Sequence, residues 1–174
     1  GSGNNGGDGF VVARLLANAG FQVTVVLVSG DPKTQDARTN FQLLADLPVP
    51  IITMDGMEEG ALEQGDMPDV LVDAMFGTGF HGVMRGNALK AAKYINNCHE
   101  KHGKKVFALD IPSGLGGDQL KKKKISCEII KADYTITFHA RKPVHMRRFA
   151  ACYCGEILVA DIGIDEEKLM TVEI

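Results

Sequence analysis

The sequence predicts an α/β protein built on a mostly parallel, doubly wound sheet. Apolar runs rich in β-branched residues alternate with longer stretches of helical period, and glycines cluster where the apolar runs end. Strands that alternate with helices pair in parallel through right-handed crossovers. The length of 174 residues suits a sizeable core, so we expect a single domain over residues 1–174.

Six apolar runs have the composition of buried strands. They cover residues 21–28, 49–53, 70–75, 106–111, 134–138 and 157–160. The last two have only a short connection with no clear helix, which favours an antiparallel or mixed edge of the sheet.

Three segments between the strands have the period of helices. They cover residues 10–18, 39–47 and 88–101. In the first, apolar residues at positions 11, 12, 15, 16 and 19 form one face. A helix that begins near Gly9 in such a fold needs a preceding buried strand, which would end immediately before Gly1. We therefore expect that the domain lacks its first strand in this sequence.

Composition argues against several classes of protein. The formal charge of −3 gives no electrostatic case for nucleic acid as a partner, and no apolar run approaches the roughly 20 residues that span a bilayer. No secretory signal is visible, so we expect a cytoplasmic location, or a mitochondrial one in a eukaryote. The four cysteines lack zinc-site spacing and indicate free thiols, and the lysine run at 121–124 indicates a solvated loop.

A glycine-rich segment opens the chain and leads directly into the first predicted helix. Gly1, Gly3 and Gly6 satisfy the G-x-G-x-x-G pattern, and Asp31 follows the next strand at about the spacing of a dinucleotide site. Glycines let a phosphate approach the backbone, and the helix N-terminus offers it unpaired N–H groups. Alone, this pattern is a weak indication of function.

Two further segments follow strands and carry both an acid and glycine. Residues 73–80 begin with Asp73, and residues 110–115 begin with Asp110. Ligands of open α/β sheets bind beyond the carboxyl ends of the strands, so we expect all three segments to converge on one crevice. Ser113 is not in a G-x-S-x-G motif, which gives a hydrolase triad no support, and the histidines show no metal spacing.

The segments together resemble the NAD(P)H-hydrate epimerase family, the YjeF N-terminal domain. The motifs are N-N-G-G-D-G at 4–9, Asp73 with G-T-G at 77–79, D-I-P-S-G at 110–114, A-D-Y-T-I-T-F at 132–138 leading to Lys142, and V-A-D-I-G-I at 159–164. The resemblance runs in order over nearly the whole chain. Residues 80–85 and 116–124 differ from the family's common sequence. This difference affects the expected substrate contacts more than the expected reaction.

This resemblance implies a three-layer α/β/α Rossmann-like sandwich, often a homodimer. The implied reaction interconverts the R and S forms of hydrated NADH and NADPH (NADHX and NADPHX). The epimerase thereby feeds a stereospecific ADP- or ATP-dependent dehydratase, which in many bacteria is fused to it.

The resemblance also implies roles for particular residues. Asp110 would be the general acid/base, and Lys142 would neutralise the substrate's charge or assist proton transfer. A potassium ion would be bound by Asn5, Asp73 and Ser113. The implied substrate-binding residues are Asn4, Asn5, Gly6, Gly7, Asp8, Gly77, Thr78, Gly79, Phe80, His81, Gly82, Val83 and Asp110.

Two other functions stay open at this point. An NAD-dependent dehydrogenase would share the glycine loop and Asp31, but 174 residues leave little room for a separate substrate domain. A non-catalytic scaffold of the same fold, such as those in RNA-decapping assemblies, could lose the acids. The presence of Asp73, Asp110 and Lys142 together favours the enzyme.

Overall fold

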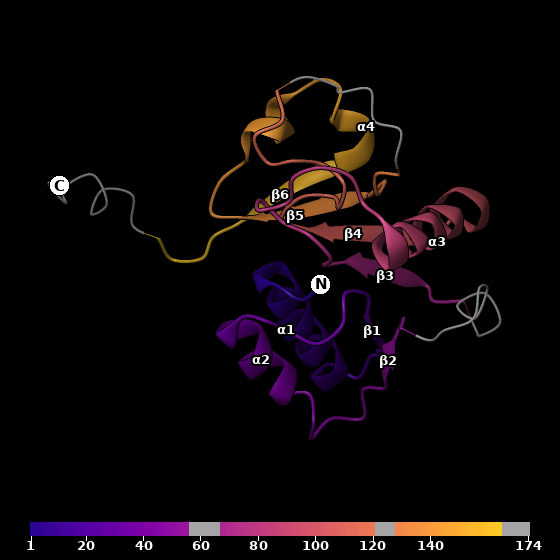
Figure 1. Cartoon of the computed structure of the whole chain (residues 1–174). Coiled ribbons are helices and arrows are strands. Elements are labelled where there is room, and N and C mark those ends of the chain that lie inside the picture. Colours follow the sequence, from indigo (N-terminus) through magenta and orange to yellow (C-terminus); the bar gives the residue numbers. More distant parts are fainter. Residues whose placement is uncertain (56–66, 121–127, 165–174) are drawn as a thin grey trace, which may run out of the picture.

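A computed structural model describes residues 1–55, 67–120 and 128–164 of the chain (Figure 1). The strands are β1 (Val25–Leu27), β2 (Ile51–Thr53), β3 (Val70–Asp73), β4 (Lys105–Leu109), β5 (Tyr134–Phe138) and β6 (Glu156–Ala160). The helices are α1 (Asn4–Asn18), α2 (Gln35–Gln42), α3 (Gly86–His102), the 3₁₀ helix η2 (Pro143–Met146) and α4 (Ala151–Cys154). The expected alternation of strands and helices is confirmed.

The described strands form two sheets, and every pairing in them is parallel. β1 pairs with β2, while the second sheet has the order β3-β4-β5-β6. The expectation of an antiparallel or mixed edge is therefore wrong. Parallel neighbours need a crossover of about a dozen residues or more. Residues 139–155, which include η2 and α4, supply one and bring β6 back in the direction of β5.

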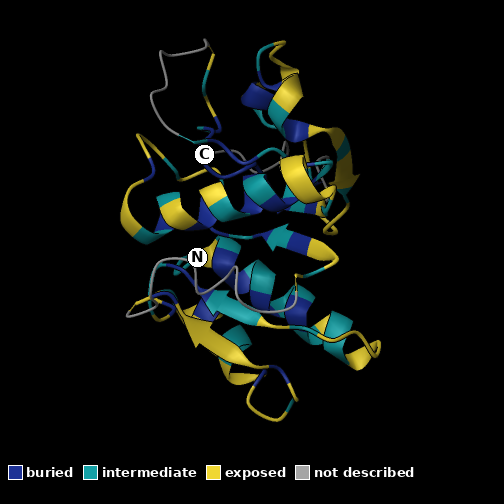
Figure 2. Cartoon of the chain, turned by 90° about the vertical axis from the view of Figure 1, so that its right-hand side faces the viewer, coloured by how far each residue is buried: buried dark blue, intermediate teal, exposed yellow. Residues whose placement is uncertain are grey.

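Helices cover the strands on two sides, as the alternation of side chains along β1 shows. Leu27 belongs to an apolar cluster with Phe10 of α1 and Ala37 of α2. Its neighbours Val26 and Val28 belong instead to a cluster with α3 residues such as Ala92. Because successive side chains of a strand point to opposite faces, α1 with α2 and α3 lie in separate layers. This arrangement agrees with the predicted α/β/α sandwich (Figure 2).

The first helix begins earlier than its apolar pattern indicated. α1 starts at Asn4, so Gly6, Gly7 and Gly9 are helical and do not form a phosphate-wrapping turn. These glycines allow neighbouring segments to approach α1 closely, because a side chain would be in the way. A Cβ added on Gly7 would lie 3.1 Å from Cα of Ala37. On Gly9, it would lie 2.6 Å from the side chain of Ala74. The glycines that marked a loop in the sequence therefore let α1 pack tightly.

The second helix also begins earlier than expected, at Gln35, and ends at Gln42. Thr34 caps it, because its hydroxyl accepts a hydrogen bond from the Ala37 amide at 3.3 Å. The periodic segment at 39–47 continues beyond the helix only as turns. The first strand is shorter than predicted, covering only 25–27 of residues 21–28.

The two sheets meet at β1 and β3, which do not pair with each other in the described part of the chain. Figure 1 places the N-terminal end of the described chain between them. One apolar cluster still spans both sheets, since it joins Val28 and Met54 to Leu71 and Val106. A strand ahead of Gly1 stays a prediction.

Other expectations concern surface and redox features. Among the described residues, no helix is both long and apolar enough to cross a membrane. Cys98, Cys152 and Cys154 are free thiols, and no group of three metal-binding His, Cys, Asp or Glu side chains occurs in the described ranges. The lysine run at 121–124 lies outside the described residues.

Candidate functional site

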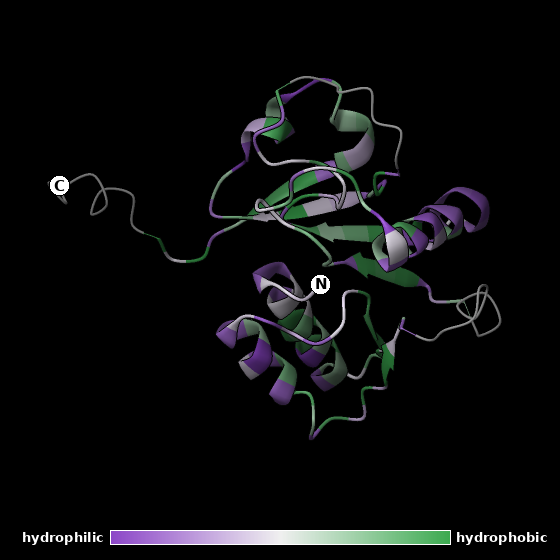
Figure 3. Cartoon of the chain, in the orientation of Figure 1, coloured by the Kyte–Doolittle hydropathy of each residue, from purple (hydrophilic) through white to green (hydrophobic). Residues whose placement is uncertain are grey.

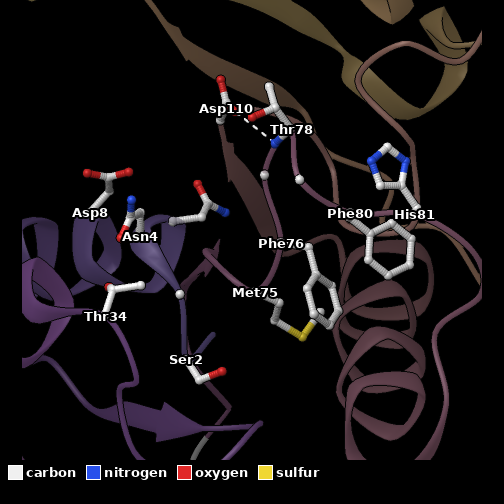
Figure 4. A pocket seen from close by; sticks show the side chains of 14 residues that line it. Ser2, Asn4, Asp8, Thr34, Met75, Phe76, Thr78, Phe80, His81 and Asp110 are labelled. Carbon is white, nitrogen blue, oxygen red and sulfur yellow. Dashed lines mark hydrogen bonds between the residues drawn. The ribbon is translucent and has the colours of Figure 1, made fainter.

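A cavity of about 700 Å³ lies beyond the carboxyl end of β3 and beside the start of α1 (Figure 4). All three acid- and glycine-bearing segments contribute to it. Its lining residues are Ser2, Gly3, Asn4, Asn5, Asp8, Thr34, Met75, Phe76, Gly77, Thr78, Gly79, Phe80, His81 and Asp110. In Figure 3, β1 and β3 have hydrophobic colours, whereas the start of α1 beside the cavity is coloured hydrophilic.

Several residues of the predicted substrate-binding set do not line the cavity. Gly6 and Gly7 are buried in α1, and Gly82 and Val83 are exposed, and none of the four lines the cavity. Asp31, which has about the spacing of a dinucleotide site, is also exposed and outside the lining.

Several lining residues were missed by sequence reasoning. Met75 and Phe76 lie in the predicted segment after β3, and that position could have indicated them. Thr34 could have been found only as a helix cap. The Phe76 and Phe80 rings pack together in the wall, with centroids 4.7 Å apart.

Asp110 follows β4 and holds a conformation that only a few non-glycine residues adopt. Its φ is +64°, in the left-handed region, where strain costs about 1–3 kcal/mol and concentrates at functional sites. The amide of Thr78 donates to its Oδ2 at 3.2 Å, and the Thr137 hydroxyl lies 3.2 Å from its Oδ1. The turn thus aims the carboxylate at the Gly77–Gly79 loop (Figure 4).

Lys142 lies directly beside this carboxylate. Its Nζ is 2.8 Å from Oδ1 of Asp110, and the lysine side chain is only 19% exposed. The ammonium also donates to the carbonyl of Phe138 at 2.7 Å and to the hydroxyl of Thr137 at 3.0 Å. Tertiary structure therefore brings together the two residues that the sequence indicated for catalysis.

Asp73 and Ser113 form a second polar cluster. The Ser113 amide donates to Oδ2 of Asp73 at 2.7 Å and its hydroxyl to Oδ1 at 2.7 Å, while the Phe76 amide donates to that hydroxyl. Burial raises the pKa of the Asp73 carboxyl, and the hydrogen bonds from Ser113 and Met75 act in the opposite direction. A buried carboxylate of this kind favours a neutralising cation nearby.

Asn5 has polar atoms that protein groups leave unused. Its amide nitrogen and oxygen are both buried, with no hydrogen-bond partner among the described residues. The side chain lies over Gly77, where an added Cβ would be 3.4 Å from Cβ and Cγ of Asn5. Buried polar groups almost always have partners, so this amide is available for a ligand.

Asp8 adds a further acid to the cavity. Burial raises the pKa of its carboxyl, and the charge of Asp110 raises this pKa further. Since the first amides of α1 also face this region, the site combines anionic side chains with a helix N-terminus.

Helices on both faces of parallel strands, with a polar cavity beyond their carboxyl ends, define an α/β protein of the Rossmann-like class. Residues 1–144 match the family model described as "YjeF-related protein N-terminus". The chain belongs to this family, and the resemblance in its motifs is confirmed.

Curated relatives match over nearly the whole chain. The bifunctional NAD(P)H-hydrate repair enzyme Nnr of Archaeoglobus fulgidus is 43% identical over 166 residues, which cover 95% of this chain and 32% of that protein. The NAD(P)H-hydrate epimerase of Cenarchaeum symbiosum is 36% identical over 170 residues, covering 96% and 73%. The chain thus spans only about a third of the length of the bifunctional relative.

The fold is also similar to that of a solved protein. A crystal structure of yeast ynu0 has a TM-score of 0.65 and 26% sequence identity, covering 86% of this chain and 60% of that one. This likeness agrees with the predicted fold class.

Proposed function

We propose that this chain interconverts the R and S forms of NADHX and NADPHX. The contact between Asp110 and Lys142 beside the cavity is the observation that carries the proposal. It gives a member of this family the charged pair that the reaction requires. The names of the curated epimerases support the same assignment.

The chemistry of the substrate explains why such a pair suffices. The reacting carbon carries a hydroxyl group and the ring nitrogen, so inversion requires one of these bonds to break and re-form on the opposite face. A proton is taken up and returned, with no net change in composition. Asp110 accepts or donates this proton, and Lys142 stabilises the charge that the carboxylate gains or loses.

The remaining cavity residues would hold the nucleotide. Unpaired amides at the start of α1, near Asn4 and Asn5, suit its phosphates. Thr78, Phe80 and His81 would contact it from the opposite wall. These assignments rest on position in the cavity.

The donor groups of Asn5, Asp73 and Ser113 fit a potassium ion beside the cavity. Asn5 has an unused buried amide oxygen, and Asp73 with Ser113 supplies a buried carboxylate and a hydroxyl. Oxygen donors are what a hard cation requires. When bound, the ion would supply positive charge against the buried Asp73.

Potassium is expected to raise the thermal stability of the chain. If the ion is present at about 100 times its dissociation constant, it stabilises the fold by about 2.7 kcal/mol. The melting temperature in potassium chloride should therefore exceed that in choline chloride at equal ionic strength. Asn5→Leu should remove this increment, whereas Asn87→Leu should keep it, because the Asn87 amide donates to Asp55 and lies outside the cavity lining. Equal melting temperatures for the unmodified protein in both salts would refute the site.

A coupled assay tests the proposed activity. The protein is mixed with racemic NADHX and an S-specific dehydratase, and formation of NADH is followed. Complete conversion is expected, since the R form is continually turned into the S form. Conversion that stops at half would indicate a scaffold, and reduction of NAD by a substrate would indicate a dehydrogenase.

The functional partner that we propose is an ADP- or ATP-dependent NAD(P)H-hydrate dehydratase. Several relatives bear the name of a bifunctional repair enzyme, which supports this pairing. Assembly as a homodimer is a further proposal from the resemblance, and a cytoplasmic or mitochondrial location stays a proposal from the sequence.

A further inference from the structure

His145 forms a closed ring of hydrogen bonds with Lys142 at the start of η2. The backbone amide of Lys142 donates to Nδ1 of the imidazole at 3.1 Å. The backbone amide of His145 donates to the carbonyl of Lys142 at 2.9 Å. Pro143 lies between them at the first position of the 3₁₀ helix. The backbone of Lys142 is thus held from both sides.

These two hydrogen bonds hold the backbone of the residue whose side chain contacts Asp110. The Nζ of Lys142 lies 2.8 Å from Oδ1 of Asp110, and this distance depends on the position of the Lys142 backbone. Carbonyls of Phe138 and Ala140 hold the ammonium end, and the imidazole holds the backbone end. Without the imidazole, the amide of Lys142 loses its acceptor and the lysine can shift.

The protonation state of the His145 imidazole follows from the same contacts. Nδ1 accepts a hydrogen bond and so carries no proton, which places the proton of the neutral ring on Nε2. His145 is only 8% exposed, and its Nε2 is buried. Burial lowers the pKa of His145 and the charges of Lys142 and Arg141 act in the same direction, while the charge of Asp110 and a hydrogen bond with the Asp110 backbone act against it. The neutral ring that the contact needs is the favoured form.

We propose that His145 is a positioning residue that holds Lys142 against Asp110 by accepting its backbone hydrogen bond. The proposal rests on the proposed function for the meaning of that contact. It assigns to η2 a part in the site that the cavity lining alone does not reveal.

Two substitutions separate the acceptor from the shape of the side chain. His145→Asn keeps an acceptor oxygen in the place of Nδ1, and His145→Leu keeps a branched side chain without an acceptor. In the leucine variant we expect kcat to fall by about 10-fold to 100-fold with KM nearly unchanged, because the charged pair is misplaced. The asparagine variant should recover most of this loss. Unchanged kcat in His145→Leu would overturn the proposal, as would equal losses in both variants.

The pH profile provides a readout that a purely structural role would not move. A protonated ring presents N–H at Nδ1 to the Lys142 amide, so the contact breaks as the pH falls. With a folded pKa below about 6.5, the unfolded chain takes up the proton first. The stability from this contact is therefore present above pH 6.5 and is lost as the pH falls through the folded pKa. An acid limb of kcat in this range should disappear in His145→Asn, and its persistence there would overturn the proposal.

A measurement without turnover separates this proposal from the proposed function. The ¹⁵N signal of the Lys142 ammonium should change in His145→Leu and return in His145→Asn. If the chain shows no epimerisation at all, the proposed function fails, and this signal still decides the role of His145. An unchanged signal in the leucine variant overturns it.

Discussion

Replacing Asp110 by asparagine is expected to lower the rate of epimerisation by about 10²-fold or more. The substitution keeps the shape of the side chain and one of its two oxygens, which can serve either Lys142 or the Thr78 amide, and it removes the group that exchanges a proton. Substrate affinity should change much less than kcat. Initial rates in the dehydratase-coupled assay, over a range of NADHX concentrations, provide both values.

Asp69→Asn is the matched control for this loss. Asp69 is almost fully exposed ahead of β3 and pairs only with Lys104 among the described residues, so the same change of charge occurs away from the cavity. Its kcat should equal that of the unmodified chain. If Asp110→Asn also turns over normally, the carboxylate is not the acid/base, and Lys142 becomes the principal candidate.

The substitution Gly155→Ala is expected to destabilise the fold by about 3 kcal/mol or more. Gly155 joins α4 to β6 with φ +57°. A Cβ there would lie 2.1 Å from the carbonyl oxygen of Asp133, and that oxygen accepts the hydrogen bond of Glu156 that begins the strand. Because backbone atoms cause the clash, no side-chain rotation relieves it. Urea unfolding followed by circular dichroism measures the loss.

Gly103→Ala separates this clash from left-handed strain alone. Gly103 ends α3 with φ +64°, but its Cβ position has open space around it. Alanine there should cost only about 1–2 kcal/mol. Similar losses at both positions would show that the backbone at Gly155 can move away from Asp133.

Local patterns predicted the strands well and the helix boundaries less well. The run at 134–138 is a strand in full, since its β-branched and aromatic residues favour extended backbone. The start of α1 was hidden because three glycines in its first turns have low helix propensity. Two of them, Gly7 and Gly9, are explained by the close approach of the helix to Ala37 and Ala74, which are far away in the sequence.

The candidate site was predictable where it follows strands. Asp73 and Asp110 each come directly after an apolar run, and parallel strands bring such positions to one edge. The contact of Lys142 with Asp110 was expected only from the family resemblance, because a lysine 32 residues further on has no local signal. His145 had no signal at all as a site residue.

The sequence by itself determined the fold class, the order of strands and helices, and the three segments that meet at the cavity. These follow from period and composition, which act over a few neighbouring residues. Tertiary structure alone decided the parallel direction of β6, the unused amide of Asn5 against Gly77, and the ring that joins His145 to Lys142 beside Asp110. Each depends on distances between chain segments, and a pattern of residue types contains no information on how closely two packed segments approach.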